Sequence, residues 1–574
     1  MCKEKNFSRW PIGVHRTLNY PEIPVYGFLD AAAARFPDRV AIRFSGTEIT
    51  YGEFLVLVHR FANALDARGV RKGDRVAIHL LNCPQFAIAY YALLKLGAIF
   101  VPCSPLLTER ELKHQLTDSG AETLITLDLF FALTKKVIAQ APVKNLIVTS
   151  LADNFPALSI TTKPLRKLKI DQGEDFINLL EEGSPDPIGV AIDPMRDLAH
   201  LSYTGGTTGL PKGVMLTHYN IVANVLQCFH FYTGGKPVMD EGLIAYDLSD
   251  IPANADLGMK PGRTTLIVVP WFHAMGTIAY LNLQFYAGHT MILFPRFDPG
   301  PFIRAVEKYH AEVIGGAPQL FIPMITHPDF ARTDLSSVKT VISGAAPLPA
   351  EVMRRLMAAF PGVVTEGYGM TEVTLAATAN PSSRQAVKVG SVGIPIIDTE
   401  VKIIDLTTGK PVAQGGVGEL CIRGPQCMQG YWNQPRETGD VLIDGWMHSG
   451  DIGHEDADGY FFITDRKKDM IIYKGYNVYP KELEEILYTH PAVFQCAVVG
   501  RPDEKGGEIP VAFVRLSPDQ KATEAEIMNF VNAQVAPYKQ IRRVVLVDEL
   551  PVNMAGKVLK RELRESLEGK NRLS

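Results

Sequence analysis

The most informative stretch of the chain reads Tyr203-Thr204-Gly205-Gly206-Thr207-Thr208-Gly209-Leu210-Pro211-Lys212-Gly213-Val214. Its glycines let the main chain approach a ligand closely and point several N–H groups at one anion. A flexible loop would account for the glycines, but not for the threonines and the lysine among them. The common nucleotide-binding pattern is absent, because no Gly-Lys pair in the chain is followed by Ser or Thr, as that pattern requires. We therefore predict a site for a polyphosphate.

Helical and strand patterns alternate on the N-terminal side of this stretch. Helices are predicted at Phe28–Phe36, Tyr51–Arg68 and Gln85–Leu96, and strands at Val40–Phe44 and Arg75–Leu80. Later apolar strands are predicted at Thr265–Val269 and Thr340–Ile342. Such alternation is typical of an α/β fold with layered, largely parallel sheets, in which ligands bind beyond the carboxyl ends of the strands.

Two segments interrupt this alternation. Gly234–Gly262 is rich in Gly, Pro and Asp and shows no clear period, so it is either a surface decoration or a lid over a substrate channel. A basic turn at Asp465–Asp469 is followed by a separate strand–helix pattern, with a helix at Pro480–Tyr488 and a strand at Ala492–Val499. We predict a large N-terminal domain of several subdomains over residues 1–466 and a small, mobile α+β domain over 467–574.

Composition excludes several classes of protein. The 574 residues are 46% hydrophobic and carry a net charge of −4, which argues against disorder and against a globally basic nucleic-acid binder. The seven cysteines are scattered without a Cys-x-x-Cys pair, so neither a zinc site nor a disulfide framework is expected. We find no apolar run of membrane-spanning length and no apolar core of a secretory signal near Met1. We predict a cytoplasmic protein and leave open peripheral membrane contact and a homodimer.

Further motifs follow the glycine-rich stretch in a fixed order. They are Pro270-Trp271-Phe272-His273-Ala274-Met275-Gly276, Ser343-Gly344-Ala345-Ala346-Pro347-Leu348, Glu366-Gly367-Tyr368-Gly369-Met370-Thr371-Glu372, His448-Ser449-Gly450-Asp451-Ile452-Gly453, Asp465-Arg466-Lys467-Lys468-Asp469 and Gly556-Lys557. With these motifs the chain resembles the adenylate-forming superfamily of acyl-CoA synthetases, peptide-synthetase adenylation domains and beetle luciferases, from about Tyr51 to Arg561. Each motif alone is weak evidence for this superfamily, but the occurrence of all of them in the superfamily's order is specific to it.

The resemblance implies an ATP site and a role for each of its residues. The implied ATP-binding residues are Thr204, Gly205, Gly206, Thr207, Thr208, Lys212, Gly344, Ala345, Ala346, Glu366, Gly367, Tyr368, Gly369, Met370, Thr371, Asp451, Arg466 and Lys557. Tyr368 offers an aromatic face for adenine, and Asp451 and Arg466 can bind the ribose. Glu372 and Thr204 supply oxygen ligands for Mg²⁺, and both are predicted to be catalytic together with Lys557 and His273.

The resemblance also implies two half-reactions. Lys557 reaches the carboxylate and the α-phosphate while the adenylate forms, because a compact ammonium offsets the negative charges that must meet. Lys468 is then the hinge about which the C-terminal domain turns. This turn brings the face around Lys474, Gly475 and Tyr476 toward the site for coenzyme A.

An acyl pocket is implied next to the ATP site, with the candidate residues His273, Gly276, Thr277, Gln319, Gly344, Gly367 and Met370. The pocket motif has no acid to pair with an ammonium, which disfavours an amino acid as the substrate. The glycines leave space, which favours a medium- or long-chain fatty acid, with aryl acids left open. No carrier domain follows Lys557, so the expected acceptor is coenzyme A.

Three hypotheses remain from the sequence. The leading one is an ATP-dependent carboxylic acid–CoA ligase that binds only small molecules: the acid, ATP and coenzyme A. The second is an enzyme that diverts the acyl-adenylate to another acceptor, including luciferase-like oxygenation. The third, a non-catalytic binding protein, is disfavoured because Lys212, Glu372, Asp451, Arg466 and Lys557 are all present.

Overall fold

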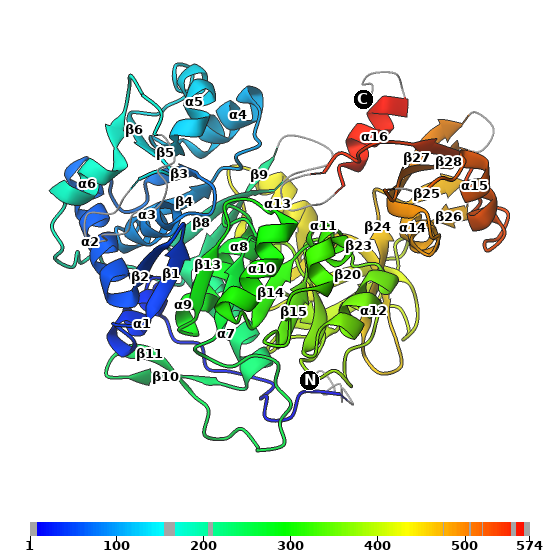
Figure 1. Ribbon diagram of the computed structural model, residues 1–574, viewed down its shortest axis with the longest axis horizontal. Helices are drawn as coiled ribbons and strands as arrows, with labels where there is room; N and C mark the ends of the chain where they lie inside the picture. Colours follow the sequence, from blue (N-terminus) through cyan, green and yellow to red (C-terminus); the bar gives the residue numbers. More distant parts are fainter. Residues whose placement is uncertain are drawn as a thin grey trace.

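A computed structural model describes residues 9–153, 167–204, 211–474, 476–503, 507–518, 520–552 and 558–567. Figure 1 shows a large body of sheets and helices, with a smaller C-terminal body beside it. This arrangement confirms the predicted mixed α/β class with a large N-terminal and a smaller C-terminal domain. In the described part of the chain, no helix has both the length and the apolar character needed to cross a membrane.

Two large sheets form the core of the larger body. The first has nine strands in the order β18-β17-β16-β15-β14-β12-β13-β1-β2, and the second has eight in the order β21-β9-β8-β4-β3-β5-β6-β7. The first comprises β1 (Val40–Phe44), β2 (Thr47–Thr50), β12 (Thr264–Ile267), β13 (Thr290–Leu293), β14 (Val313–Gly316), β15 (Thr340–Ser343), β16 (Val363–Tyr368), β17 (Thr378–Ala379) and β18 (Ile394–Pro395). The second comprises β3 (Arg75–His79), β4 (Ile99–Pro102), β5 (Thr123–Leu127), β6 (Asn145–Thr149), β7 (Glu174–Asp175), β8 (Leu198–Thr204), β9 (Lys212–Thr217) and β21 (Gly430–Tyr431). Only strands near the sheet edges pair antiparallel.

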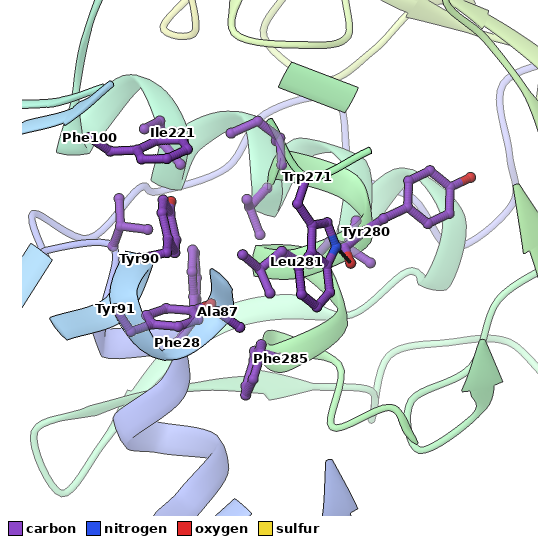
Figure 2. Close-up of a cluster of buried hydrophobic side chains, with 14 of the residues drawn as sticks. Phe28, Ala87, Tyr90, Tyr91, Phe100, Ile221, Trp271, Tyr280, Leu281 and Phe285 are labelled. Carbon is purple, nitrogen blue, oxygen red and sulfur yellow. Dashed lines mark hydrogen bonds between the residues drawn. The ribbon is translucent and has the colours of Figure 1, made fainter. Parts of the chain in front are cut away.

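The helices of the larger body cover these sheets. They are α1 (Gly27–Arg35), α2 (Tyr51–Ala67), α3 (Pro84–Lys95), α4 (Glu109–Ser119), α5 (Phe131–Ile138), α6 (Phe176–Glu182), α7 (His218–Thr233), α8 (Ala274–Thr277), α9 (Leu283–Tyr286), α10 (Pro299–Tyr309), α11 (Pro318–Thr326), α12 (Ala350–Ala359) and α13 (Pro435–Val441), with a π-helical turn at Ile278–Asn282. Every residue of α3 is buried, and its bounds differ by one residue at each end from the predicted helix at Gln85–Leu96. Figure 2 shows α3 residues Tyr90 and Tyr91 beside Phe100 of β4 and Phe285 of α9.

A third sheet is antiparallel, in a fold whose sheets were predicted to be largely parallel. It contains β19 (Glu400–Ile404), β20 (Gly418–Arg423), β22 (Leu442–Ile443), β23 (Trp446–Glu455) and β24 (Phe461–Arg466), and all of its pairs are antiparallel. Short connections such as the one from β23 to β24 favour antiparallel pairing, because parallel strands need a longer crossover.

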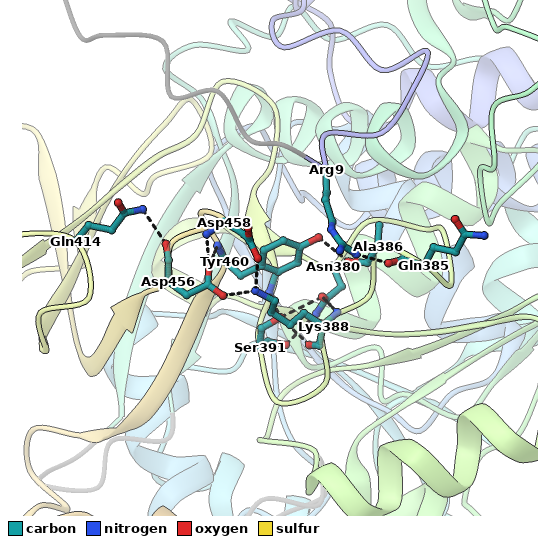
Figure 3. Close-up of polar contacts among 11 residues, drawn as sticks. Arg9, Asn380, Gln385, Ala386, Lys388, Ser391, Gln414, Asp456, Asp458 and Tyr460 are labelled. Atoms are coloured by element: carbon teal, nitrogen blue, oxygen red, sulfur yellow. Dashed lines mark hydrogen bonds and ion pairs between the residues drawn. The ribbon is translucent and has the colours of Figure 1, made fainter.

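A polar network anchors this third sheet to the body. Lys388 forms ion pairs with Asp456 and Asp458 between β23 and β24. The Tyr460 hydroxyl donates to the carbonyl oxygen of Ala386 at 2.5 Å, and Arg9 bonds to the same loop at Gln385, as Figure 3 shows. The network holds β23 and β24, which carry two predicted ATP-site residues.

The segment Gly234–Gly262, whose sequence shows no clear period, includes regular secondary structure. It contains an antiparallel hairpin of β10 (Lys236–Asp240) and β11 (Leu243–Asp247). Glu241 and Gly242 both have positive φ at its turn, as two-residue turns between antiparallel strands favour. The hairpin packs on α9, where the Tyr286 hydroxyl donates to the carbonyl oxygen of Ala245 at 2.9 Å.

The smaller body has its own sheet and core. Its strands are β25 (Ile471–Tyr473), β26 (Tyr476–Val478), β27 (Val493–Asp503), β28 (Gly507–Leu516) and β29 (Arg543–Leu546), and its helices are α14 (Pro480–Tyr488), α15 (Glu524–Asn532) and α16 (Lys560–Leu567). The sheet order is β26-β25-β28-β27, with β29 beside β28. Leu483 and Leu487 of α14 point into this core. The predicted helix at Pro480–Tyr488 is confirmed.

Candidate functional site

The glycine-rich stretch joins two paired strands of the second sheet. Thr204 ends β8 and lies opposite Lys212, the first residue of β9. The Lys212 ammonium is 4.9 Å from the centroid of the Tyr431 ring. Gly205, Gly206, Thr207 and Thr208 lie outside the described residues. Thr204 and Lys212 thus lie side by side at the end of the strand pair where the chain passes from β8 to β9.

Tyr368, Asp451 and Arg466 form one connected group. The Tyr368 hydroxyl donates to Asp451 Oδ2 at 2.6 Å, and Arg466 Nε lies 3.2 Å from Asp451 Oδ1. Asp451 and Arg466 face each other across β23 and β24. Burial and the adjacent carboxylate of Asp451 raise the pKa of Tyr368, so the hydroxyl keeps its proton and acts as the donor. The structure brings the predicted adenine and ribose residues together.

Glu372 lies in a short 3-10 turn (Thr371–Val373) after β16. Its Oε1 accepts a hydrogen bond of 2.8 Å from the Tyr431 hydroxyl. Burial raises the pKa of Glu372, although this hydrogen bond opposes the rise. Since Tyr431 also contacts Lys212, one ring links the predicted metal ligand to the glycine-rich stretch. Sequence reasoning missed Tyr431, because an isolated Gly-Tyr pair carries no distinctive local pattern.

Glu366 supports the loop that follows β15. It is 4% exposed, and its Oε1 accepts the N–H of Leu348 at 3.0 Å. Burial raises the pKa of Glu366 to about 7. Two other predicted ATP-site residues in this region have constrained backbones. Ala345 has φ of 66°, and a Cβ at Gly369 would lie 1.6 Å from the carbonyl oxygen of Leu375.

Two cavities that share lining residues lie beside the group of Tyr368, Asp451 and Arg466. An inner cavity of about 110 Å³ is lined largely by apolar side chains, and an outer cavity measures about 370 Å³. His273, Met275 and Ala345 line both cavities. The other predicted ATP-site and acyl-pocket residues that line the inner cavity are Gly344, Gly367, Tyr368, Gly369, Met370 and Thr371. The inner cavity therefore opens beside the predicted adenine site.

The remaining acyl-pocket candidates lie in different places. Gln319 lines the outer cavity. Gly276 and Thr277 line neither cavity. A Cβ at Gly276 would lie 1.9 Å from the carbonyl oxygen of Pro270, so this glycine permits close backbone packing and does not leave substrate space. The Thr277 hydroxyl donates to the carbonyl oxygen of His273 at 3.2 Å.

The segment Gly234–Gly262 contributes only Met259 to the inner cavity among the described residues. Its hairpin, β10–β11, lines neither of the two cavities. A role in substrate selection by this segment would therefore act through Met259, which the sequence pattern did not single out.

The remaining candidates belong to the C-terminal part of the chain. Lys468 follows β24 in the connection to the smaller body. Lys474 has φ of 50°, and the exposed Tyr476 stacks on Tyr538 with ring centroids 4.8 Å apart. Gly475 and Lys557 lie outside the described residues. Val552, on the N-terminal side of Lys557, lines the outer cavity.

Comparison with known proteins gives matches over most of the chain. A family model described as AMP-binding enzyme matches residues 29–432, and a model for the AMP-binding enzyme C-terminal domain matches residues 482–557. The long-chain-fatty-acid–CoA ligase of Bacillus subtilis (strain 168) is 38% identical over 567 residues, which are 97% of this chain and 97% of the relative. The 4-coumarate–CoA ligase 2 of Oryza sativa subsp. japonica is 34% identical over 95% of this chain and 92% of its own.

Solved structures agree with these matches. ATP-bound MatB from Rhodopseudomonas palustris has a TM-score of 0.81 at 28% identity, covering 96% of this chain and 100% of its own. An anthranilate CoA ligase in complex with anthranoyl-AMP has a TM-score of 0.82 at 25% identity, covering 95% of this chain and 98% of its own.

Proposed function

The chain belongs to the AMP-binding enzyme family, as an AMP-forming acyl- or aryl-CoA ligase, and we propose that its acid is a medium- or long-chain fatty acid. In the first half-reaction the carboxylate attacks the α-phosphorus of ATP, which gives acyl-adenylate and pyrophosphate. In the second, the thiol of coenzyme A attacks the acyl carbon and releases AMP. The similarity to a long-chain-fatty-acid–CoA ligase over nearly the whole chain supports this substrate class.

The observation that supports the proposal most strongly is that two cavities meet beside the Tyr368–Asp451–Arg466 group. The apolar inner cavity suits an acyl chain, since burying apolar surface there is favourable. We propose that the thiol of coenzyme A would reach the acyl carbon through the outer cavity. His273 lines both cavities, at the place where carboxylate, α-phosphate and thiol would meet in turn.

Charge neutralisation is the main chemical task of the first half-reaction, because a carboxylate must approach a polyphosphate. Lys212 and Thr204 are proposed to hold the phosphates, and Lys557 to lie at the attacking carboxylate. The carboxylate of Glu372 suits Mg²⁺, which prefers oxygen ligands and retains phosphate and water as partners. Bound with Thr204 and Glu372, Mg²⁺ would neutralise charge on the leaving pyrophosphate.

Domain rotation would separate the two half-reactions. We propose that the C-terminal domain, residues 467–574, turns about Lys468 after the adenylate forms. Lys557 then leaves the site, and the face around Lys474, Gly475 and Tyr476 approaches it. Stacked Tyr476 and Tyr538 rings beside Lys474 form a surface suited to a nucleotide base and its phosphates.

Pyrophosphate exchange into ATP tests the function directly. The purified protein is offered saturated fatty acids of increasing length, with and without coenzyme A. We expect acid-dependent exchange without coenzyme A, and acyl-CoA with stoichiometric AMP when coenzyme A is added. If no acid of the panel supports pyrophosphate exchange, adenylate formation is contradicted. If AMP is released but no thioester forms, the acyl group goes to another acceptor.

An aryl acid is the second candidate substrate. The inner cavity of about 110 Å³ is modest, and Tyr232 and Tyr280 line it. Aromatic walls favour stacking with a substrate ring. Hydroxycinnamic and benzoic acids therefore belong in the same panel, and a higher kcat/KM for these than for every fatty acid would select this candidate.

A further inference from the structure

Helix α12 begins without a capping side chain of its own. Its N-cap residue is Pro349, which makes no side-chain capping hydrogen bond. The first N–H groups of a helix have no partner within the helix and carry partial positive charge. Here Glu485 Oε2, from α14 of the smaller body, accepts the N–H of Ala350 at 3.2 Å. A carboxylate of one body therefore caps a helix of the other.

Other residues on the same face of α14 also contact the larger body. Lys481, Glu485 and Tyr488 lie four and three positions apart, on one side of the helix. The Lys481 ammonium donates to the carbonyl oxygen of Ile463 at 2.7 Å. Tyr488 packs against the apolar core that includes Val352 of α12 and also against the core of the smaller body. This face of α14 therefore forms a contact between the two bodies, on the side of the smaller body that lies toward the larger one in Figure 1.

The capped helix is connected to the adenine site. The loop between β15 and α12 begins with Gly344 and Ala345, which line the inner cavity. Glu366 holds the N–H of Leu348 in this loop, and Glu485 holds the N–H of Ala350 two residues later. The charge of Lys481 stabilises both carboxylates against the pKa-raising effect of burial. The residue that contacts the smaller body and the residues that line the adenine site therefore lie on one short stretch of chain, from Gly344 to Ala350.

The orientation of the two bodies also brings the C-terminal segment to the site, because Val552 lines the outer cavity with His273 and Ala345. We infer that Glu485 is a positioning residue for adenylate formation, which fastens the C-terminal domain in this orientation through the N-terminus of α12. The inference rests on the proposed function, since it assigns Glu485 to the first of two orientations. The contact must break before the domain turns, so it favours the first half-reaction at the expense of the second.

The two half-reactions measured separately test this role. Glu485→Ala removes the cap, and Glu482→Ala is the matched control, because Glu482 lies on the same helix but pairs with Lys539 inside the smaller body at 2.7 Å. We expect pyrophosphate exchange to fall about tenfold in Glu485→Ala, which corresponds to ~1.4 kcal/mol. Thioester formation from supplied acyl-adenylate should stay constant or rise. Glu485→Gln keeps an acceptor oxygen and should retain more exchange activity than Glu485→Ala.

Hydrogen exchange gives a readout that needs no substrate. Amide exchange in a peptide spanning residues 346–356 should be faster in Glu485→Ala than in wild type and unchanged in Glu482→Ala. Equal losses in both half-reactions would overturn the inference, and so would unchanged amide exchange. If the wild type activates no acid, the proposed function fails, while amide exchange still reports whether the contact exists.

Discussion

Glu366 makes the stability of the larger body dependent on pH. Its carboxyl is 4% exposed, and burial raises its pKa from 4.5 to about 7. The folded protein therefore holds the Glu366 proton more tightly than the unfolded chain does. This carboxyl contributes its full stability below pH 4.5, and the contribution is lost as the pH rises through 7. Glu366→Gln removes the titration while leaving an amide oxygen to accept the N–H of Leu348.

The magnitude follows from the pKa difference between the folded and unfolded states. Each pKa unit corresponds to ~1.36 kcal/mol, so raising the pH from 5 to 8 should destabilise the wild type by about 2 to 3 kcal/mol through Glu366 alone. The Glu366→Gln variant should not lose this part of its free energy of unfolding, because its amide does not titrate. Other carboxyls, such as Asp465 with a pKa of about 6, titrate in both the wild type and the variant. Their contributions to the free energy of unfolding therefore cancel when the two proteins are compared.

Urea unfolding followed by tryptophan fluorescence is a suitable assay. The chain has 4 tryptophans, and all of them, Trp10, Trp271, Trp432 and Trp446, precede the smaller body. Their signal therefore reports the larger one, which contains Glu366. The free energy of unfolding of Glu366→Gln minus that of the wild type should increase by about 2 to 3 kcal/mol from pH 5 to pH 8. A difference that does not change with pH would refute the assignment of a neutral buried carboxyl.

Further changes test the remaining parts of the site. Tyr431→Phe removes a hydrogen bond to a buried carboxylate worth about 1.5–3 kcal/mol; kcat/KM for MgATP should fall at least tenfold with little change in KM for the acid, and an effect on the acid alone would contradict the link to Glu372. Lys557→Ala should abolish pyrophosphate exchange yet spare thioester formation from supplied acyl-adenylate, whereas Lys468→Pro should do the reverse; equal losses in either variant would argue against two orientations. Met259→Ala should shift the chain-length profile, and replacing the turn between β10 and β11 should not; the opposite pattern would assign selection to the hairpin.

The sequence by itself determined the fold class and the chemical groups of the site. Strand Val40–Phe44 and helix Pro480–Tyr488 could be predicted with their observed bounds, because periodicity and turn residues act over a few neighbouring positions. The motif residues Tyr368, Asp451 and Arg466 could be predicted as one group, but only because their motifs follow one another in the same order as in the adenylate-forming superfamily.

Tertiary structure alone decided how these groups are supported. The Tyr431–Glu372 hydrogen bond joins residues 59 positions apart, and the Glu485–Ala350 contact joins residues 135 apart. No local pattern encodes such pairs, because sheet register and domain packing set them. Gly276 shows the same limit, since its missing side chain could equally have left space for substrate. Only the position of the Pro270 carbonyl decides that it serves backbone packing.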